Sequence, residues 1–350
     1  MVRLFTKPGD LVADPFMGGG TCGVEALAEG RRFLGGDVNQ LAYFISRVKT
    51  NALSAHDEAC VLGWASALPS SIDLSAPDIS DQPWVAYQKN LPWRLRKLLS
   101  QALATLEVFS NGSQREFARC ALLCTAQRVL DCKSKIPSKE DFLTKYLEVV
   151  SDMLVGQGEF KDRFISATGG QTAITKVRQL LCADASRLHT LKRAHALGTP
   201  KLVLTSPPYL GVHVLYHRWQ ILGRKETSAP YWLANKLDGH MGTFYTFADR
   251  RAKTPDRYLE KLLECFKSVT RLMTKNTLVM QLVAFPDADV QLPLYLETLQ
   301  RAGLQKCDVL ERNTASVPVS REVPNRRWYA LVTNQTNSST EFLLVHRLAK

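Results

Sequence analysis

Residues 11–21 read LVADPFMGGGT, and this stretch decides the fold. A short apolar run, Leu11–Ala13, directly follows a Pro-Gly-Asp turn, which is typical of a buried strand. Three consecutive glycines come next. Segment 21–29 then has apolar residues at helical spacing and stops at Gly30. The pattern predicts a strand, a glycine loop and a helix, which is how a doubly wound α/β sheet begins.

The same alternation continues on both sides of a long interruption. Segments 32–37 and 40–50 predict a second strand and a second helix. The interruption at 52–165 shows helical periodicity, strongest at 91–109, 113–132 and 138–153. The alternation resumes near residue 175, with strands predicted at 201–204, 277–285 and 305–310, helices at 258–273 and 292–302, and a closing antiparallel pair at 328–333 and 342–345.

We therefore predict two domains. Residues 1–51 and 166–350 form an α/β domain with a doubly wound, mostly parallel sheet and an antiparallel closing pair. Residues 52–165 form a helical insertion, for which a target-recognition role and a structural cap both remain open.

The composition is that of an ordinary globular protein, with 350 residues, 45% of them hydrophobic and 22% charged. No apolar run reaches the roughly 18 residues of a membrane helix, and we expect a cytoplasmic protein. The eight cysteines include no CxxC pair, which predicts reduced thiols and no metal site. The net charge of +12 favours a polyanionic partner, most commonly nucleic acid.

The glycine loop begins with an acid, and a second acid ends the next predicted strand. Asp37 lies 23 residues after Asp14, where nucleotide-binding folds bind a ribose hydroxyl. The alternatives are a turn without a ligand, a Walker loop, which needs Gly-Lys-Ser/Thr, and a dinucleotide fingerprint, which is incomplete here. A carboxylate at Asp14 repels pyrophosphate and suits a cationic ligand, which favours S-adenosylmethionine over NAD or ATP.

A second stretch, LTSPPYL at 204–210, ends a predicted core strand on two prolines. Neither proline donates an N–H, and the first restricts the backbone of Ser206. The result is a rigid polar corner with Tyr209 at its tip. Such a stretch is common in linkers. Here it follows a buried strand in a chain that also contains the glycine loop, and this combination indicates a function.

Together, DPFMGGGTCGVEALAEGRRFLGGDVNQ at 14–40 and TSPPY at 205–209 resemble the amino-methylating DNA methyltransferases, whose motifs read DPFxGxGT and [S/D/N]PP[Y/F/W]. The resemblance implies a Rossmann-like class I methyltransferase fold with S-adenosyl-L-methionine as cofactor. It assigns the methionine end of the pocket to Asp14, Pro15, Phe16, Gly18, Gly20 and Thr21. It assigns the ribose hydroxyls to Asp37 and the adenine amine to Asp184, for which a solvent-facing turn is the alternative.

The corner fits methyl transfer to an exocyclic amine, whose lone pair is delocalised into the base. The Ser206 hydroxyl and the Pro207 carbonyl supply two acceptors for the amine, and Pro208 keeps them rigid. Tyr209 can stack on a flipped base. No Pro-Cys dipeptide occurs, which argues against methylation at C5 of cytosine. In the family, SPPY accompanies N4 of cytosine more often than N6 of adenine.

We therefore expect direct in-line transfer to N4 of cytosine in duplex DNA. The alternatives are N6 of adenine, an RNA or protein acceptor, and a catalytically impaired DNA-binding relative. A cognate restriction endonuclease is a candidate partner beside the DNA, and the sequence does not reveal whether one exists. Aromatic residues interleaved with basic ones predict nucleic-acid contacts, with a packed lid as the alternative reading; the residues are Arg218, Arg224, Lys225, Tyr231, Trp232, Arg326 and Arg327.

The sequence departs from the family in two respects. The long insertion separates the cofactor motif from the catalytic motif, an order that differs from the usual one for this type of loop. The family also normally carries a helical segment before its first strand, which helps to close the methionine pocket, and only residues 1–10 precede the strand here. Three explanations stay open: the given sequence starts late, another chain fills this place, or the enzyme is impaired.

Overall fold

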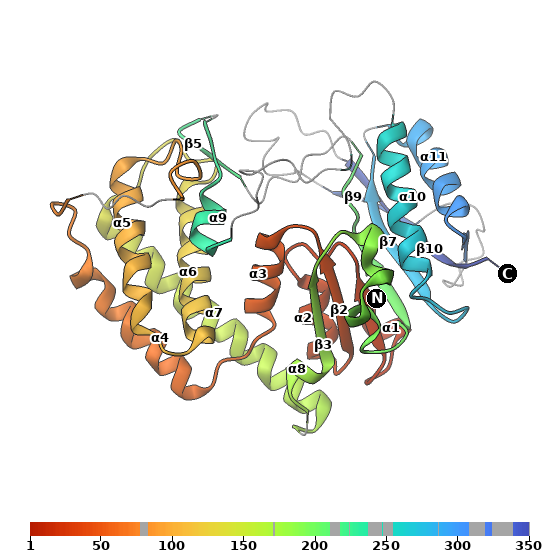
Figure 1. Cartoon of the computed structure of the whole chain (residues 1–350), viewed down its shortest axis with the longest axis horizontal. Helices are drawn as coiled ribbons and strands as arrows, with labels where there is room; N and C mark the ends of the chain where they lie inside the picture. Colours follow the sequence, from red (N-terminus) through yellow and green to blue (C-terminus); the bar gives the residue numbers. More distant parts are fainter. Residues whose placement is uncertain are drawn as a thin grey trace. The chain divides into compact units, whose positions relative to one another are not determined.

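The computed structural model describes residues 1–77, 83–170, 172–210, 218–223, 225–236, 247, 255–285, 287–307, 319–323 and 339–349. The chain forms two compact units (Figure 1). The first, the α/β unit, comprises Met1–Ser46, Arg163–Val214 and Tyr245–Lys350. The second, the helical unit, comprises Arg47–Asp162 and Leu215–Phe244. Residues 215–244 thus group with the helices, whereas the predicted domains placed them with the sheet.

The α/β unit is built on an eight-stranded sheet in the described part of the chain, with strand order β3-β2-β1-β4-β7-β10-β8 and β9 paired to β10. The strands β3, β2, β1, β4 and β7 run parallel, and β10 is antiparallel to its neighbours. The strands are β1 Leu11–Asp14, β2 Arg32–Asp37, β3 Arg178–Cys182, β4 Leu202–Thr205, β7 Leu278–Ala284, β8 Leu304–Lys306, β9 Val319–Val323 and β10 Ser339–Leu348. This confirms the predicted α/β fold with a doubly wound, mostly parallel sheet.

The antiparallel part of the sheet is centred on β10, which pairs with β7, β8 and β9. The predicted strand at 342–345 lies inside β10. Its predicted partner at 328–333 lies outside the described residues.

Side chains alternate between the two faces of the sheet, as strand geometry requires. On one face, Val203 and Val279 pack with residues of α10 (Asp256–Thr270), α11 (Ala288–Arg301) and the 3-10 helix η3 (Ala185–Thr190). On the other face, Leu202 and Leu278 pack with Phe5 of α1 (Val2–Phe5). The α/β unit also contains α2 Thr21–Ala28, α3 Gln40–Lys49 up to Ser46, α8 Ile174–Val177 and the 3-10 helix η4 Lys192–His195.

The helical unit is built around α6 (Gly112–Leu130), whose buried residues include Phe117. The predicted helix at 138–153 is longer in the structure: α7 runs from Lys139 to Thr168 and continues through two glycines at positions where a side chain would meet nothing within 4 Å. The other elements are α4 Ala55–Ala67, η1 Leu68–Ser71, α5 Trp93–Ala104, η2 Thr105–Val108, β5 Trp219–Ile221, β6 Lys225–Thr227 and α9 Ala229–Ala234. No helix among the described residues is long and apolar enough to cross a membrane.

Candidate active site

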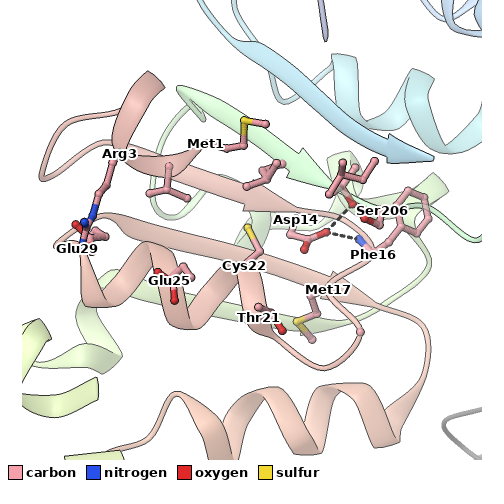
Figure 2. Close-up of a pocket in the computed structure, with 15 residues that line it drawn as sticks. Met1, Arg3, Asp14, Phe16, Met17, Thr21, Cys22, Glu25, Glu29 and Ser206 are labelled. Atoms are coloured by element: carbon pink, nitrogen blue, oxygen red, sulfur yellow. Dashed lines mark hydrogen bonds and ion pairs between the residues drawn. The ribbon is translucent and has the colours of Figure 1, made fainter. Parts of the chain in front are cut away.

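The candidate site lies where the parallel sheet changes winding direction, between β1 and β4, because β2 and β3 extend to one side of β1 and β4 and β7 to the other. Ligands of open α/β sheets bind at the carboxyl ends of strands at such a point. A cavity of about 840 Å³ is found there (Figure 2). Its lining joins both sequence motifs, with Asp14, Phe16, Gly18 and Thr21 from the first and Ser206 from the second.

Asp14 is held by two donors at the end of β1. The Thr205 hydroxyl donates to Oδ1 of Asp14 at 2.6 Å, and the backbone N–H of Phe16 donates to the same oxygen at 3.1 Å. The side chain is buried, and burial raises the pKa of this carboxyl to about 7. The hydrogen bond from Thr205 also joins the cofactor motif to the residue that directly precedes Ser206.

Asp37 supports the glycine loop from the end of β2. The backbone N–H of Gly18 donates to Oδ2 at 2.9 Å, and that of Asn39 donates to Oδ1 at 2.8 Å. Burial raises the pKa of Asp37 to about 6. Asp37 is not among the residues that line the cavity. Because a carboxylate offers roughly four lone-pair positions, Asp37 can still accept hydroxyl donors beside these two contacts.

The shape of the loop depends on its glycines. Gly18 and Gly20 have φ angles of +47° and +76°, a region that favours glycine. A Cβ on Gly20 would lie 2.6 Å from Oγ of Ser46. The Ser46 hydroxyl in turn donates to the carbonyl of Gly18 at 3.0 Å. The helix α3 therefore packs directly against the loop and leaves no room for a side chain.

The corner at 206–209 leaves β4 beside the cavity. Ser206 is exposed and lines the cavity, Pro207 is buried, and Pro208 and Tyr209 are partly buried. The Tyr209 hydroxyl donates to Oε1 of Glu341 at 3.3 Å, and Arg321 donates to the other oxygen of that carboxylate. Of the four predicted catalytic residues, Ser206 is the one that lines the cavity.

Asp184 lies apart from the cavity lining, at the start of η3. It accepts the backbone N–H of Ser186 at 2.9 Å and forms an ion pair with Lys261 at 2.9 Å. Burial alone would raise the pKa of Asp184, but the contacts with Lys261 and Ser186 outweigh it and the pKa is lowered. The structure thus shows a local capping role for Asp184, and contact with an adenine amine stays a prediction.

The predicted nucleic-acid contacts are only partly placed. Arg218 forms an ion pair with Glu226 at 2.9 Å, and Lys225 is exposed. Tyr231 and Trp232 are 0% and 2% exposed, so their rings are core residues of the helical unit and cannot stack on a base in this structure. This corrects the expectation for those two aromatics. The other predicted contacts, Arg224, Arg326 and Arg327, lie outside the described residues.

Sequence reasoning identified only Thr21 on one wall of the cavity. This wall also contains Cys22 and Glu25 of α2, Glu29 directly after α2, Val2 and Arg3 of α1, and Met1 directly before α1. The helical spacing of Thr21, Glu25 and Glu29 is a signal that could have extended the prediction along this wall. Thr205, Met17, Leu204 and Leu282 complete the lining.

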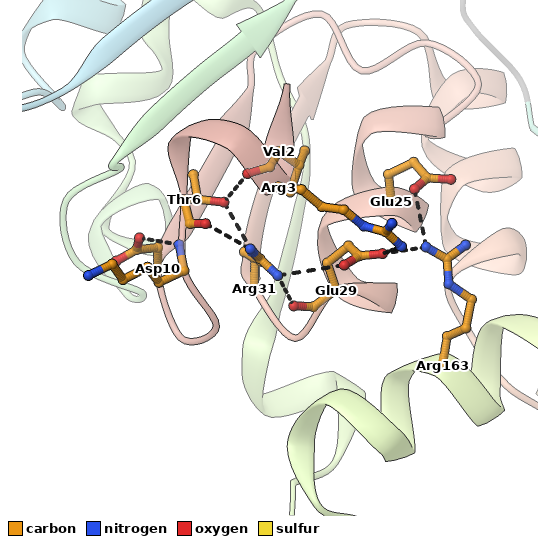
Figure 3. A network of polar contacts seen from close by, with 9 residues as sticks. Val2, Arg3, Thr6, Asp10, Glu25, Glu29, Arg31 and Arg163 are labelled. Atoms are coloured by element: carbon orange, nitrogen blue, oxygen red, sulfur yellow. Dashed lines mark hydrogen bonds and ion pairs between the residues drawn. The ribbon is translucent and has the colours of Figure 1, made fainter.

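The helix α1 is tied to α2 by charged residues (Figure 3). Arg3 donates to Glu29 at 2.6 Å, and Arg163 of α7 donates to the same carboxylate at 2.5 Å. The hydrogen bond from Arg3, followed by that from Arg163, lowers the pKa of Glu29 to about 2 against the opposing effect of burial. The structure thus shows a short helix, α1, before the first strand, and its residues Val2 and Arg3 line the cavity.

Residues 1–46 match the family model described as DNA methylase, of the N6/N4 amino-methylating type. The match confirms the resemblance to amino-methylating DNA methyltransferases in the part of the chain that contains the glycine loop and Asp37. It supports methyl transfer as the class of reaction and implies S-adenosylmethionine as the methyl donor. Comparison with curated proteins finds no match.

Two solved structures of the rRNA methyltransferase aviRa from Streptomyces viridochromogenes align with the chain. Each alignment covers 97% of this chain and 78% of the aviRa chain. The TM-score is 0.32 at 10% sequence identity for one structure and 0.33 at 9% for the other. An alignment this loose does not bear on the substrate of this chain.

The cavity fits S-adenosylmethionine in size and charge. Its volume lies within the roughly 300–1,000 Å³ of small-molecule sites. Burial raises the pKa of Asp14 to about 7, and a sulfonium or ammonium group beside this carboxyl would favour its ionised form. Gly18 of the loop lines the cavity, and Gly20 keeps its positive φ against Ser46, where a side chain has no room. In the part of the chain that the structure describes, no group of three His, Cys, Asp or Glu side chains is placed to hold a metal ion.

Proposed function

We propose that the chain transfers a methyl group from S-adenosylmethionine to the exocyclic amine of a base in duplex DNA, with N4 of cytosine as the target. One observation carries the proposal: Asp14 and Ser206 line a single cavity, and Thr205 joins Asp14 to the corner that contains Ser206. The family match over residues 1–46 supports the cofactor half of the proposal.

S-adenosylmethionine supplies an electrophilic methyl group. Asp14, Phe16, Gly18 and Thr21 hold its charged end in the proposal, and Asp37 accepts its ribose hydroxyls. Ser206 and the carbonyl of Pro207 accept the N–H groups of the target amine, which makes its lone pair available. The choice of cytosine rests on Ser206 in the first position of the corner, because serine accompanies N4 methylation more often in the family.

An exposed basic surface supports a nucleic-acid substrate. The 3-10 helices η3 and η4 carry Arg187, Lys192 and Arg193, all exposed and without an ion-pair partner among the described residues. The 3-10 helix η3 packs on α10, where His189 and Ser268 lie within hydrogen-bonding distance at 2.9 Å. Together with the net charge of +12, this surface can attract a phosphate backbone.

A transfer assay tests the proposal. The protein and tritium-labelled S-adenosylmethionine are incubated in three separate reactions, with duplex DNA, with RNA and with protein as the acceptor. We expect incorporation into DNA, and incorporation into RNA or protein alone would contradict the proposal. Ser206→Ala should lower transfer by about 10²-fold, since one preorganised donor or acceptor contributes about 3 kcal/mol to the transition state.

The matched control for Ser206→Ala is calorimetry with S-adenosylmethionine. Ser206 is assigned to the amine, so the variant should bind the cofactor nearly as well as the wild-type protein. Loss of cofactor binding would mean that Ser206 contacts the cofactor and not the target amine. An unchanged transfer rate would mean that its hydroxyl does not activate the amine.

A further inference from the structure

The backbone of the corner receives a hydrogen bond from α10, a helix about 50 residues further along the chain. The Tyr258 hydroxyl, from α10, donates to the carbonyl of Pro208 at 2.8 Å. Tyr258 is 3% exposed, and burial raises the pKa of its hydroxyl, which therefore remains a donor. Pro207 and Pro208 have no N–H, so two successive residues of the corner cannot be anchored as donors.

The ring of Tyr258 also connects the corner with the glycine loop. Tyr258 contacts Phe247 with ring centroids 5.5 Å apart, and Phe247 contacts Phe16 at 5.6 Å. Phe16 lines the cavity beside Asp14. The corner is thus joined to the cofactor motif on two sides, through Thr205 and Asp14 on one and through Tyr258, Phe247 and Phe16 on the other.

We propose that Tyr258 is a positioning residue. Its hydroxyl holds the backbone of the corner beside the cavity, so that Ser206 and the Pro207 carbonyl can both accept hydrogen bonds from the target amine. The assignment rests on the proposed function for its catalytic consequence. In the protein alone, without cofactor or substrate, removal of the Tyr258 hydroxyl lets the corner move away from its place beside Thr205. A displacement of about 1 Å at such a site costs as much as 10²-fold in rate.

A second buried tyrosine provides a matched control. Tyr295 of α11 belongs to the same core cluster, is 0% exposed and donates its hydroxyl to Gln281 of β7. Tyr258→Phe and Tyr295→Phe each remove one buried hydroxyl and keep the ring. A general loss of core stability should affect both variants, whereas loss of positioning should affect only the first.

Hydrogen exchange of the free protein is the first measurement. The amides of Ser206, Tyr209 and Leu210 should exchange at least several-fold faster in Tyr258→Phe than in the wild-type protein or in Tyr295→Phe. Equal exchange in all three proteins would overturn the proposal. This readout needs neither cofactor nor substrate, so it decides the positioning role even if the proposed methyl transfer is not observed with any acceptor.

Kinetics is the second measurement. With duplex DNA, Tyr258→Phe should lower kcat by about tenfold or more while the affinity for S-adenosylmethionine changes less than about twofold. Tyr295→Phe should leave kcat near that of the wild-type protein. An equal loss of kcat in both variants, or a loss confined to cofactor affinity, would contradict the positioning role. A wild-type protein without activity would contradict the proposed function instead.

Discussion

At the scale of the residue, Asp14 is the most informative side chain. Burial raises its pKa to about 7 from an ordinary 3.8, so between these values the folded protein binds a proton more tightly than the unfolded chain. The fold therefore loses stability as the pH rises from about 4 to about 7, and the loss is complete above that range. Asp37, with a pKa raised to about 6, acts in the same direction.

Asp14→Asn isolates this contribution. The amide oxygen can still accept the hydrogen bonds of Thr205 and Phe16, but the side chain cannot ionise. We expect the midpoint of thermal unfolding of the variant, relative to that of the wild-type protein, to rise by at least about 2 °C between pH 5 and pH 8. Parallel pH dependence of the two proteins would show that Asp14 is already ionised at pH 5.

Asp14 and Ser206 could be identified from the sequence because each belongs to a short motif with a strict chemical requirement. Thr205 could not be assigned a role, because its hydrogen bond to Asp14 spans 191 residues and depends on the pairing of β1 with β4. The ion pair of Asp184 could not be predicted for a related reason: its partner Lys261 lies on a helix distant in sequence.

At the scale of the element, the junction between the glycine loop and α2 is the most constrained. Gly20→Ala adds a methyl group against Ser46 at a φ of +76°, whereas Gly9→Ala adds one at a φ of +85° with nothing within 4 Å. Both variants incur the strain of the left-handed region, about 1–2 kcal/mol. We expect only Gly20→Ala to lose stability beyond this amount and to lose binding of S-adenosylmethionine.

Denaturant unfolding and calorimetry on the two glycine variants measure these effects. Equal loss of stability in the two variants, together with cofactor binding by Gly20→Ala, would contradict the prediction. It would mean that Ser46 shifts to accommodate the methyl group and that the loop is less constrained than the structure indicates.

The helix α1 supports a second prediction at this scale. Arg3 lines the cavity and contacts Glu29, while Arg163 contacts the same carboxylate without lining the cavity. Arg3→Ala should accelerate dissociation of S-adenosylmethionine by a few-fold at most, since the Arg3 side chain is 71% exposed and water screens the ion pair. Displacement by excess S-adenosylhomocysteine measures the rate. Arg163→Ala is the control, and equal acceleration in both variants would mean that α1 does not close the cavity.

Most elements of the sheet could be predicted, because alternating and helical periodicities are local signals. For the segment around Tyr231 and Trp232, the aromatic and basic composition left two readings open, a nucleic-acid surface and a packed lid. The hydrophobic effect buries these two rings in the helical unit, where the ring centroids of Tyr231 and Tyr87 lie 6.0 Å apart. Composition alone does not distinguish an aromatic core from an aromatic binding surface.

At the scale of the whole molecule, the net charge of +12 predicts salt-dependent binding to nucleic acid. A triple variant removes the basic surface of η3 and η4 with the substitutions Arg187→Gln, Lys192→Gln and Arg193→Gln. The slope of log affinity against log salt concentration should become shallower by about 0.9 for each phosphate that this variant no longer neutralises. Lys7→Gln, Lys176→Gln and Lys306→Gln remove the same charge from other exposed positions of the α/β unit. Equal slopes in the two triple variants would show that net charge, not the surface of η3 and η4, governs binding.

Chemical identification of the methylated nucleoside tests the proposed function most sharply. Duplex DNA is incubated with the protein and deuterium-labelled S-adenosylmethionine, digested to nucleosides and examined by mass spectrometry. We predict labelled N4-methylcytosine, and a much smaller amount from Ser206→Ala. Labelled N6-methyladenine would keep the reaction class but change the target base. Label in neither nucleoside, with a protein that binds the cofactor, would contradict the proposed transfer to an exocyclic amine of DNA.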